Sequence, residues 1–215
     1  MSNTTRSTVT LASSGITPAD VVAVARHDAR VELASEARAE LERVRGAIDA
    51  MAASDTPVYG ISTGFGALAT THIPAFKRAK LQQSLVRSHA AGMGPAVERE
   101  TVRALMFLRA KTLASGHTGI RPSTLDTYLA ILNAGITPVV REFGSLGCSG
   151  DLSPLAHCAL VLMGEEGDRS RRCRASGRRA ARRGRHRARG AGREGRPGAH
   201  QRHRRHARPA GARAG

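Results

Sequence analysis

The sequence predicts an all-α, mainly helical protein over residues 1–167, followed by a segment of a different kind at 168–215. Three observations predict the helical class. Thr17-Pro18 is a typical pair for the N-cap and first turn of a helix. An apolar stripe recurs at helical spacing through residues 95–115. Another stripe recurs at spacings of 3, 4 and 3, so its four residues share one helix face: Leu41, Val44, Ile48 and Met51.

The expected elements follow in order along the chain. A helix at 18–29 starts at Thr17-Pro18, and a second contains the stripe at 41–51. Residues 54–74 predict a loop, because Gly, Thr, Ser and Pro crowd this stretch. Further helices are expected at 75–91, 95–115 and 122–134, then an extended or irregular connection at 135–144. Ser153-Pro154 predicts the start of a last helix that runs to about Glu166. The stripe expected to be buried in the helix at 95–115 consists of Val102, Leu105, Met106 and Leu113.

The charge of the chain is confined to its last part. The formal net charge is +17, from 34 basic and 17 acidic residues. Residues 169–215 contain 18 Arg, no Lys and one acid, Glu194, which leaves 16 basic and 16 acidic residues for 1–168. The body is therefore neutral. The last segment has no Val, Leu, Ile, Met, Phe, Tyr or Trp from Arg169 onward, so it cannot bury a core and is expected to be disordered.

Cysteine usage and the N-terminus predict a cytoplasmic protein. The three cysteines, Cys148, Cys158 and Cys173, are odd in number, and reduced thiols are the simplest interpretation. The first fifteen residues contain no apolar core of a signal peptide, and no apolar run approaches membrane-spanning length. We therefore expect neither secretion nor a membrane partner.

The tripeptide Cys148-Ser149-Gly150 has a special chemical possibility. If a tight turn brings the Gly150 nitrogen onto the Cys148 carbonyl carbon, a five-membered ring can close with loss of water. Loss of the Ser149 hydroxyl as a second water gives an alkylidene imidazolone, an electrophile built from the backbone. A helix N-terminus nearby would favour negative charge that develops there. Taken alone, the tripeptide is more typical of a plain glycine turn, and a G-x-S-x-G hydrolase elbow fits poorly because Asp151 stands where Gly is needed.

Three longer motifs change this interpretation. "VYGISTGFG" (58–66), "LVRSHAAGMG" (85–94) and "GSLGCSGDLSPLAH" (144–157) occur in this order. Together they resemble the aromatic amino acid lyases that use the methylidene-imidazolone (MIO) group, over nearly all of residues 15–167. The first ring residue is usually Ala in that family and is Cys148 here, a change that should be tolerated because only its carbonyl enters the ring. Ser153 also replaces a common Ala.

The resemblance implies roles for particular residues. Ser149 becomes the dehydrated centre of the MIO group, with Cys148 and Gly150 closing the ring. Tyr59 matches a loop tyrosine that contacts substrate and helps to handle protons, and Gly66 belongs to the same loop motif. The residues expected to bind substrate are Ser88 and His89, and those expected to support the ring loop are Asp151 and His157. Cys158 is expected to be a small core residue, and no metal or nucleotide is implied.

The Ser88-His89 pair resembles the histidine-specific branch of the family. The resemblance implies that phenylalanine and tyrosine lyases have this pair shifted, with an apolar residue or a displaced His. Tyrosine or phenylalanine therefore remains the alternative substrate. For histidine the implied reaction is a non-oxidative elimination of ammonia that gives urocanate. The resemblance also implies a homotetramer whose active sites are shared among subunits.

The arginine-rich segment at 168–215 has two interpretations. A basic arm would bind nucleic acid, non-specifically and in a salt-dependent way, and a nucleic-acid-binding protein is therefore the alternative of another class. The abundance of Arg, Ala and Gly without Lys instead indicates GC-rich DNA read out of frame. Read from the second base of each codon, residues 200–207 permit Ile-Asn-Gly-Thr-Asp-Gly-Met, which resembles the family's Asn-Gly-Thr segment. We favour the out-of-frame interpretation, which makes the triplet His200, His203 and His206 a coding artefact and not a metal site. The chain as given is then expected to be inactive.

Overall fold

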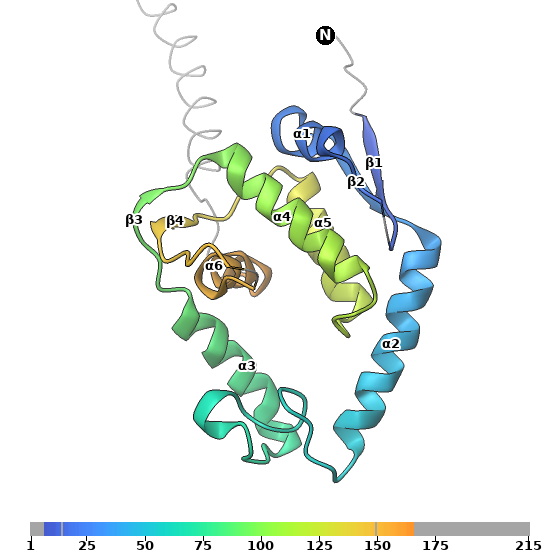
Figure 1. Ribbon diagram of the computed structural model, residues 1–215, viewed down its shortest axis with the longest axis vertical. Coiled ribbons are helices and arrows are strands. Elements are labelled where there is room, and N and C mark those ends of the chain that lie inside the picture. The colour runs from blue at the N-terminus through green and yellow to red at the C-terminus, as the bar shows by residue number, and fades with distance from the viewer. Residues whose placement is uncertain (1–6, 14, 149, 166–215) are drawn as a thin grey trace, which may run out of the picture. The chain divides into compact units, whose positions relative to one another are not determined.

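The computed structural model describes residues 7–13, 15–148 and 150–165, all within the first of two compact units, Met1–Arg169 (Figure 1). The expected mainly helical class is confirmed. The described helices are α1 (Pro18–His27), α2 (Ser35–Ala53), the short 3₁₀ helix η1 (Gly66–Leu68), α3 (Ala75–His89), α4 (Arg99–Ala114), α5 (Pro122–Asn133) and α6 (Leu152–Leu162). The segment 168–215, with Cys173 and the His200 triplet, lies outside the described residues.

Helix α1 begins where the sequence predicts, and the reason is a complete capping box. The Thr17 hydroxyl accepts a hydrogen bond from the Asp20 amide at 3.3 Å, and the Asp20 carboxylate accepts one from the Thr17 amide at 2.8 Å. Two amides at the start of the helix thereby gain side-chain partners. The helix ends at Asp28, whose φ of 56° is left-handed.

Among the described residues, four short strands form two pairs, which the sequence did not predict as sheets. Strands β1 (Thr8–Leu11) and β2 (Arg30–Leu33) pair in parallel, with α1 as their connection. Strands β3 (Met93–Ala96) and β4 (Arg141–Phe143) pair antiparallel, and β4 lies in the connection expected to be extended. On the free edge of β2, the Asn133 side chain accepts from the Val31 amide at 2.8 Å and donates to the Val31 carbonyl at 2.9 Å.

The buried core lies where α4 and α5 pack against α1 and the β1–β2 pair (Figure 1). Arg103 of α4 lies inside it, donating to the carbonyl oxygens of Val24 and Leu132 and forming an ion pair with Asp28. Of the stripe predicted on α4, Leu105 is only half-buried. The fully or almost fully buried apolar residues of the core include Leu11, Val24, Val31, Val102, Met106, Phe107, Leu113, Leu125 and Leu132.

The stripe predicted on α2 is buried at only one end. Leu41 is fully buried, Val44 and Ile48 are half-buried, and Met51 is 44% exposed. The lower part of α2 extends away from the other helices toward the loop at 54–74 (Figure 1). The apolar spacing therefore predicts the helix correctly, whereas burial ends where the neighbouring helices end.

The predicted start and end of the last helix are wrong. Helix α6 begins at Leu152 with Asp151 as its N-cap, so Ser153 and Pro154 lie inside the first turn and do not precede it. It ends at Leu162, because Gly164 adopts a left-handed φ of 76° and stops the helix before the expected position. Glu166 itself lies outside the described residues.

Within the described part of the chain, no helix is both long and apolar enough to cross a membrane.

Candidate active site

The loop that carries the C-S-G tripeptide has the backbone freedom that a ring closure needs. Gly147 and Gly150 adopt left-handed φ angles of 66° and 73°, and a Cβ atom at either position would meet nothing within 4 Å. Cys148 between them is exposed and its thiol is free. Ser149 lies outside the described residues. The residues on both sides of Ser149 are thus small or exposed and conformationally compatible with a tight turn.

Asp151 holds this loop by its side chain. Its carboxylate accepts a hydrogen bond from the Ser145 hydroxyl and another from the Leu146 amide at 3.1 Å. The Ser145 hydroxyl oxygen in turn accepts from the Gly147 amide at 3.1 Å. The Ser145 hydrogen bond, followed by the Leu146 amide, holds the pKa of Asp151 below its ordinary value. These bonds fix Asp151 against the loop just ahead of the tripeptide, and its supporting role stays a prediction.

The N-terminus of α6 follows the tripeptide directly. No side chain caps it, because the Asp151 carboxylate is turned back toward the loop. The first amides of the helix therefore keep their partial positive charge close to Gly150. An anion or a developing negative charge would be stabilised there.

His89 is the last residue of α3 and is half-buried. Its Nδ1 lies 2.8 Å from the carbonyl oxygen of Leu85 and 3.1 Å from the Ser88 hydroxyl, which itself donates to the same carbonyl at 2.9 Å. A carbonyl can only accept, so Nδ1 carries the proton, and Nε2 of the neutral ring is an acceptor. Ser88 is exposed and contacts His89 directly. The pair therefore presents one defined imidazole face.

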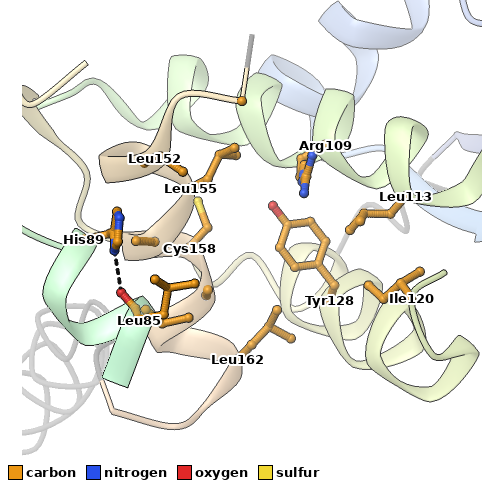
Figure 2. Close-up of a pocket in the computed structure, with 14 residues that line it drawn as sticks. Leu85, His89, Arg109, Leu113, Ile120, Tyr128, Leu152, Leu155, Cys158 and Leu162 are labelled. Carbon is orange, nitrogen blue, oxygen red and sulfur yellow. Dashed lines mark hydrogen bonds between the residues drawn. The ribbon is translucent and has the colours of Figure 1, made fainter. Parts of the chain in front are cut away.

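A pocket of about 380 Å³ lies among α3, α4, α5 and α6, and both His89 and Gly150 contribute to its wall (Figure 2). In Figure 2, Tyr128 and Cys158 point toward one another across the pocket, with Arg109 beside the phenol. Burial raises the pKa of the Cys158 thiol to about 11, and burial also raises the pKa of Tyr128. The rest of the lining is mostly apolar: Leu85, Val86, Leu113, Ile120, Leu152, Leu155, Ala156, Ala159 and Leu162.

Arg109 and Tyr128 line the pocket although the sequence motifs did not point to them. Tyr128 stands at helical spacing with Leu125, Leu129 and Leu132, which is the signal of a core position and not of a site. Cys158 is 3% exposed, as expected for a core residue, yet it also lines the pocket.

The structure does not bring Tyr59 to this pocket. Tyr59 lies in the loop between α2 and α3, is 63% exposed, and packs edge-on against Phe65 with ring centroids 5.7 Å apart. Gly66 begins η1 in the same loop with a left-handed φ of 55°. This loop joins the N-terminal end of α3, whereas His89 ends the same helix (Figure 1). Because α3 has 15 residues, its two ends are roughly 20 Å apart.

The described residues around the tripeptide fit the organic ring that the tripeptide would form. Gly147 and Gly150, which precede and follow Ser149 in the sequence, have a left-handed backbone, and a Cβ atom at either glycine would meet nothing within 4 Å. Among these described residues, no cluster of three or more His, Cys, Asp or Glu side chains is placed to hold a metal ion.

The family model of the aromatic amino acid lyases matches residues 16–193. The chain belongs to the aromatic amino acid lyase family. The match covers the three motifs and extends past residue 167 into the arginine-rich segment, so the expected boundary at 167 and the out-of-frame interpretation both stay predictions.

Individual lyases and related enzymes are similar to this chain in sequence and in fold. The histidine ammonia-lyase of Streptomyces avermitilis is 66% identical over 158 residues, which cover 74% of this chain. The solved histidine ammonia-lyase of Trypanosoma cruzi is 37% identical with a TM-score of 0.65, covering 71% of this chain and 29% of that one. The tyrosine aminomutase of Streptomyces globisporus is also 37% identical, with a TM-score of 0.66, covering 70% and 28%.

The aligned part of the chain spans only 31% of the length of the Streptomyces avermitilis lyase. Residues of that relative beyond the aligned region therefore have no counterpart among the described residues.

Proposed function

We propose that this chain carries the N-terminal part of a histidine ammonia-lyase active site, which eliminates ammonia from L-histidine to give urocanate. The observation that carries the proposal is the meeting of two distant motifs at one pocket. His89 ends α3 and Gly150 precedes α6, yet both line the same cavity. The high identity to the Streptomyces avermitilis lyase supports histidine as the substrate.

Cys148, Ser149 and Gly150 would form the MIO group, which supplies an electrophile without a metal or nucleotide. The left-handed glycines at 147 and 150 support this assignment, because ring closure needs a tight turn without crowding. Asp151 supports it by fixing the loop just ahead of the tripeptide through Ser145 and Leu146.

The other residues bind and orient the substrate. His89 has its Nε2 free to accept an N–H from the substrate imidazole, because Nδ1 donates to Leu85. Ser88 helps to hold that ring orientation. The uncapped amides at the start of α6 favour negative charge beside Gly150. Such preorganised donors lower the activation barrier of the elimination, because they need not reorient as charge develops.

Tyr59 would act in a site formed with another subunit. Its loop lies at the end of α3 opposite to His89, so one copy of the chain does not bring the two side chains together (Figure 1). A homotetramer with shared sites, as in the family, would supply Tyr59 from a neighbour, with Gly66 shaping the loop. We place this assembly in the cytoplasm, in keeping with the free thiols of Cys148 and Cys158.

The test uses a hybrid enzyme in which residues 16–165 replace the aligned part of the Streptomyces avermitilis lyase. We expect the hybrid to form urocanate and its intact mass to be lower by two water molecules. Ser149→Ala should restore the unmodified mass and abolish turnover, whereas Ser115→Ala, at the half-buried C-cap of α4, should change neither. An active hybrid with an unmodified mass would contradict the assignment of the tripeptide. Preference for tyrosine or phenylalanine would contradict the assignment of the substrate.

The 215-residue chain alone is expected to form no urocanate, because its aligned part spans only 31% of the length of the Streptomyces avermitilis lyase. Its arginine-rich segment is expected to bind DNA without sequence preference, with an affinity that falls steeply as salt rises. Measuring both activities on the same purified chain tests this: turnover by this chain, or sequence-selective binding at moderate salt, would contradict it.

A further inference from the structure

The proposed site depends on two segments that lie far apart in the chain. His89 stands at the end of α3, and the C-S-G tripeptide stands at the start of α6. A displacement of about 1 Å between a binding residue and a reacting centre can cost about 100-fold in rate. Some contact must therefore fix the end of α3 against the start of α6.

His157 makes such a contact from within α6. Its side chain is 7% exposed, and its Nε2 accepts a hydrogen bond from the Gly92 amide at 3.1 Å. Gly92 follows His89 by three residues and precedes β3. The bond thus ties the chain just after α3 to the first half of α6, across 65 positions of sequence.

The backbone around this bond is packed without spare room. A Cβ atom at Gly92 would lie 2.9 Å from His157 Nε2 and 3.3 Å from the Ser153 hydroxyl oxygen. A Cβ atom at Gly144 would lie 2.7 Å from the same oxygen and 3.0 Å from the Gly92 Cα. These four residues, which we call the Gly92 junction, join the second and third motifs: Gly92, Gly144, Ser153 and His157.

The chemistry of the bond specifies which side chains can replace His157. The Gly92 amide is a donor, so Nε2 must be an unprotonated acceptor and the neutral ring carries its proton on Nδ1. A glutamine can present its amide oxygen at nearly the same place. A leucine has a similar bulk but offers no acceptor, and it would leave the Gly92 amide without its partner.

We propose that His157 is a positioning residue for the ammonia-lyase reaction: through the Gly92 junction it fixes the segment that carries His89 against the loop that carries Ser149. The inference rests on the proposed function for its catalytic consequence. Its structural part, the bond to Gly92, can be tested without turnover.

The structural part is tested by amide hydrogen exchange of Gly92 in the full 215-residue chain. We expect His157→Leu to speed exchange of this amide about tenfold, and His157→Gln to keep it close to the parent rate. Equal exchange in the parent and in His157→Leu would overturn the proposal. Should His157→Leu fail to fold, His157→Gln is compared with His157→Asn, whose shorter side chain does not reach Gly92 and should show the faster exchange.

The catalytic part is tested in the hybrid enzyme, with kcat and KM normalised to the fraction that has lost two waters. His157→Leu should lower kcat/KM for L-histidine about 10- to 100-fold, and His157→Gln should recover most of it. The matched control is Glu165→Gln, which removes the exposed ion pair at 2.6 Å between Arg87 of α3 and Glu165, three residues after the end of α6. Glu165→Gln should leave kcat/KM within about twofold of the parent.

The outcomes separate the two claims. An inactive, unmodified parent hybrid would refute the proposed function, while the exchange of Gly92 would still decide the structural part. An active hybrid in which His157→Leu keeps the parent kcat/KM would refute the positioning role. Loss of activity in His157→Leu without recovery in His157→Gln would also refute it, because simple loss of packing would then explain the effect.

Discussion

Two regions of this molecule differ sharply in how they are packed. The core region, made of β1, α1, β2, α4 and α5, encloses side chains that are entirely buried, such as Phe107 and Leu132. The site region, residues 57–98 and 141–152, contains α3, β3 and β4, none of which has a buried residue. Large apolar side chains lie exposed on it: Tyr59, Phe76, Met93, Phe143, Leu146 and Leu152.

The difference shows which part of the chain buries its apolar surface with its own residues. Burial of apolar surface is the main stabilising term, and the core region obtains it from its own residues. The site region leaves that surface in water, and it holds Tyr59, His89 and Cys148. Apolar patches of this kind are typical of surfaces that contact other protein. We infer that the site region acquires its final form only against further subunits or further chain, as the proposed tetramer requires.

The same substitution in the two regions should have very different effects. Phe107→Ala in the core should lower the free energy of unfolding of the 215-residue chain by about 3–5 kcal/mol, because it leaves a cavity. Phe76→Ala, where the ring is 80% exposed, should change it by less than about 0.5 kcal/mol. Urea denaturation followed by circular dichroism measures both. Equal effects would show that the two regions are packed alike.

A matched pair of arginines should sharpen the comparison. Arg103→Leu in the core should cost about 3 kcal/mol, because it removes the buried guanidinium that donates to the carbonyl oxygens of Val24 and Leu132 and pairs with Asp28. Arg78→Leu in the site region should cost only about 1 kcal/mol, although Arg78 also donates to two carbonyls, those of Ile73 and Ala52, at 2.9 and 2.8 Å. Urea midpoints that shift equally for the two variants would contradict this ranking.

In the site region a substitution should instead change catalysis. His89→Leu in the hybrid enzyme should lower kcat/KM for L-histidine about 10- to 100-fold, because the N–H of the substrate imidazole loses the Nε2 atom of His89 as its acceptor. The melting temperature should hardly change, since α3 buries no residue completely. Steady-state kinetics and thermal unfolding of the same samples test this. A large loss of stability with unchanged kinetics would assign His89 a structural role.

The smallest expected effect is the acid response of the ring loop. The pKa of Asp151 is lowered in the folded state by its bonds to Ser145 and Leu146. The stabilisation is therefore fully present above the unfolded pKa of about 3.9 and is lost as the pH falls through the lower folded pKa. Protection of the Leu146 amide from hydrogen exchange should stay constant down to about pH 4 and then decline. In Asp151→Asn the acid-dependent decline should be absent, and its persistence there would point to another group.

Local signals in the sequence predicted most helices well. Thr17, Pro18 and Asp20 are adjacent, so their capping box is readable without any knowledge of the rest of the molecule. The β1–β2 pair was missed because two four-residue strands pair in parallel across a helix, and only tertiary packing makes them stable. The start of α6 was misplaced because Asp151, and not Ser153, lies at its N-cap.

Two of the predicted site residues line one pocket, whereas the geometry of the site could not be predicted. The three motifs pointed to His89 and to the tripeptide, and the structure places His89 and Gly150 on one pocket. Nothing in the sequence indicates that Tyr59 lies at the far end of α3, because that depends on the path of an exposed loop. The contact between His157 and Gly92 joins two motifs 65 residues apart, a distance over which spacing carries no information.

The side chain of Asn133 bears on how the newly synthesised chain avoids aggregation with other copies of itself. A two-stranded sheet has two open edges, and an open edge invites a strand from another molecule. Asn133 occupies both backbone groups of Val31 on the outer edge of β2, much as a third strand would. It thereby closes that edge to strand addition with a single residue. The closure comes late, however, because Asn133 follows Val31 by 102 positions. During synthesis α5 must leave the ribosome before Asn133 can cover this edge, so the edge is open to strand addition until then.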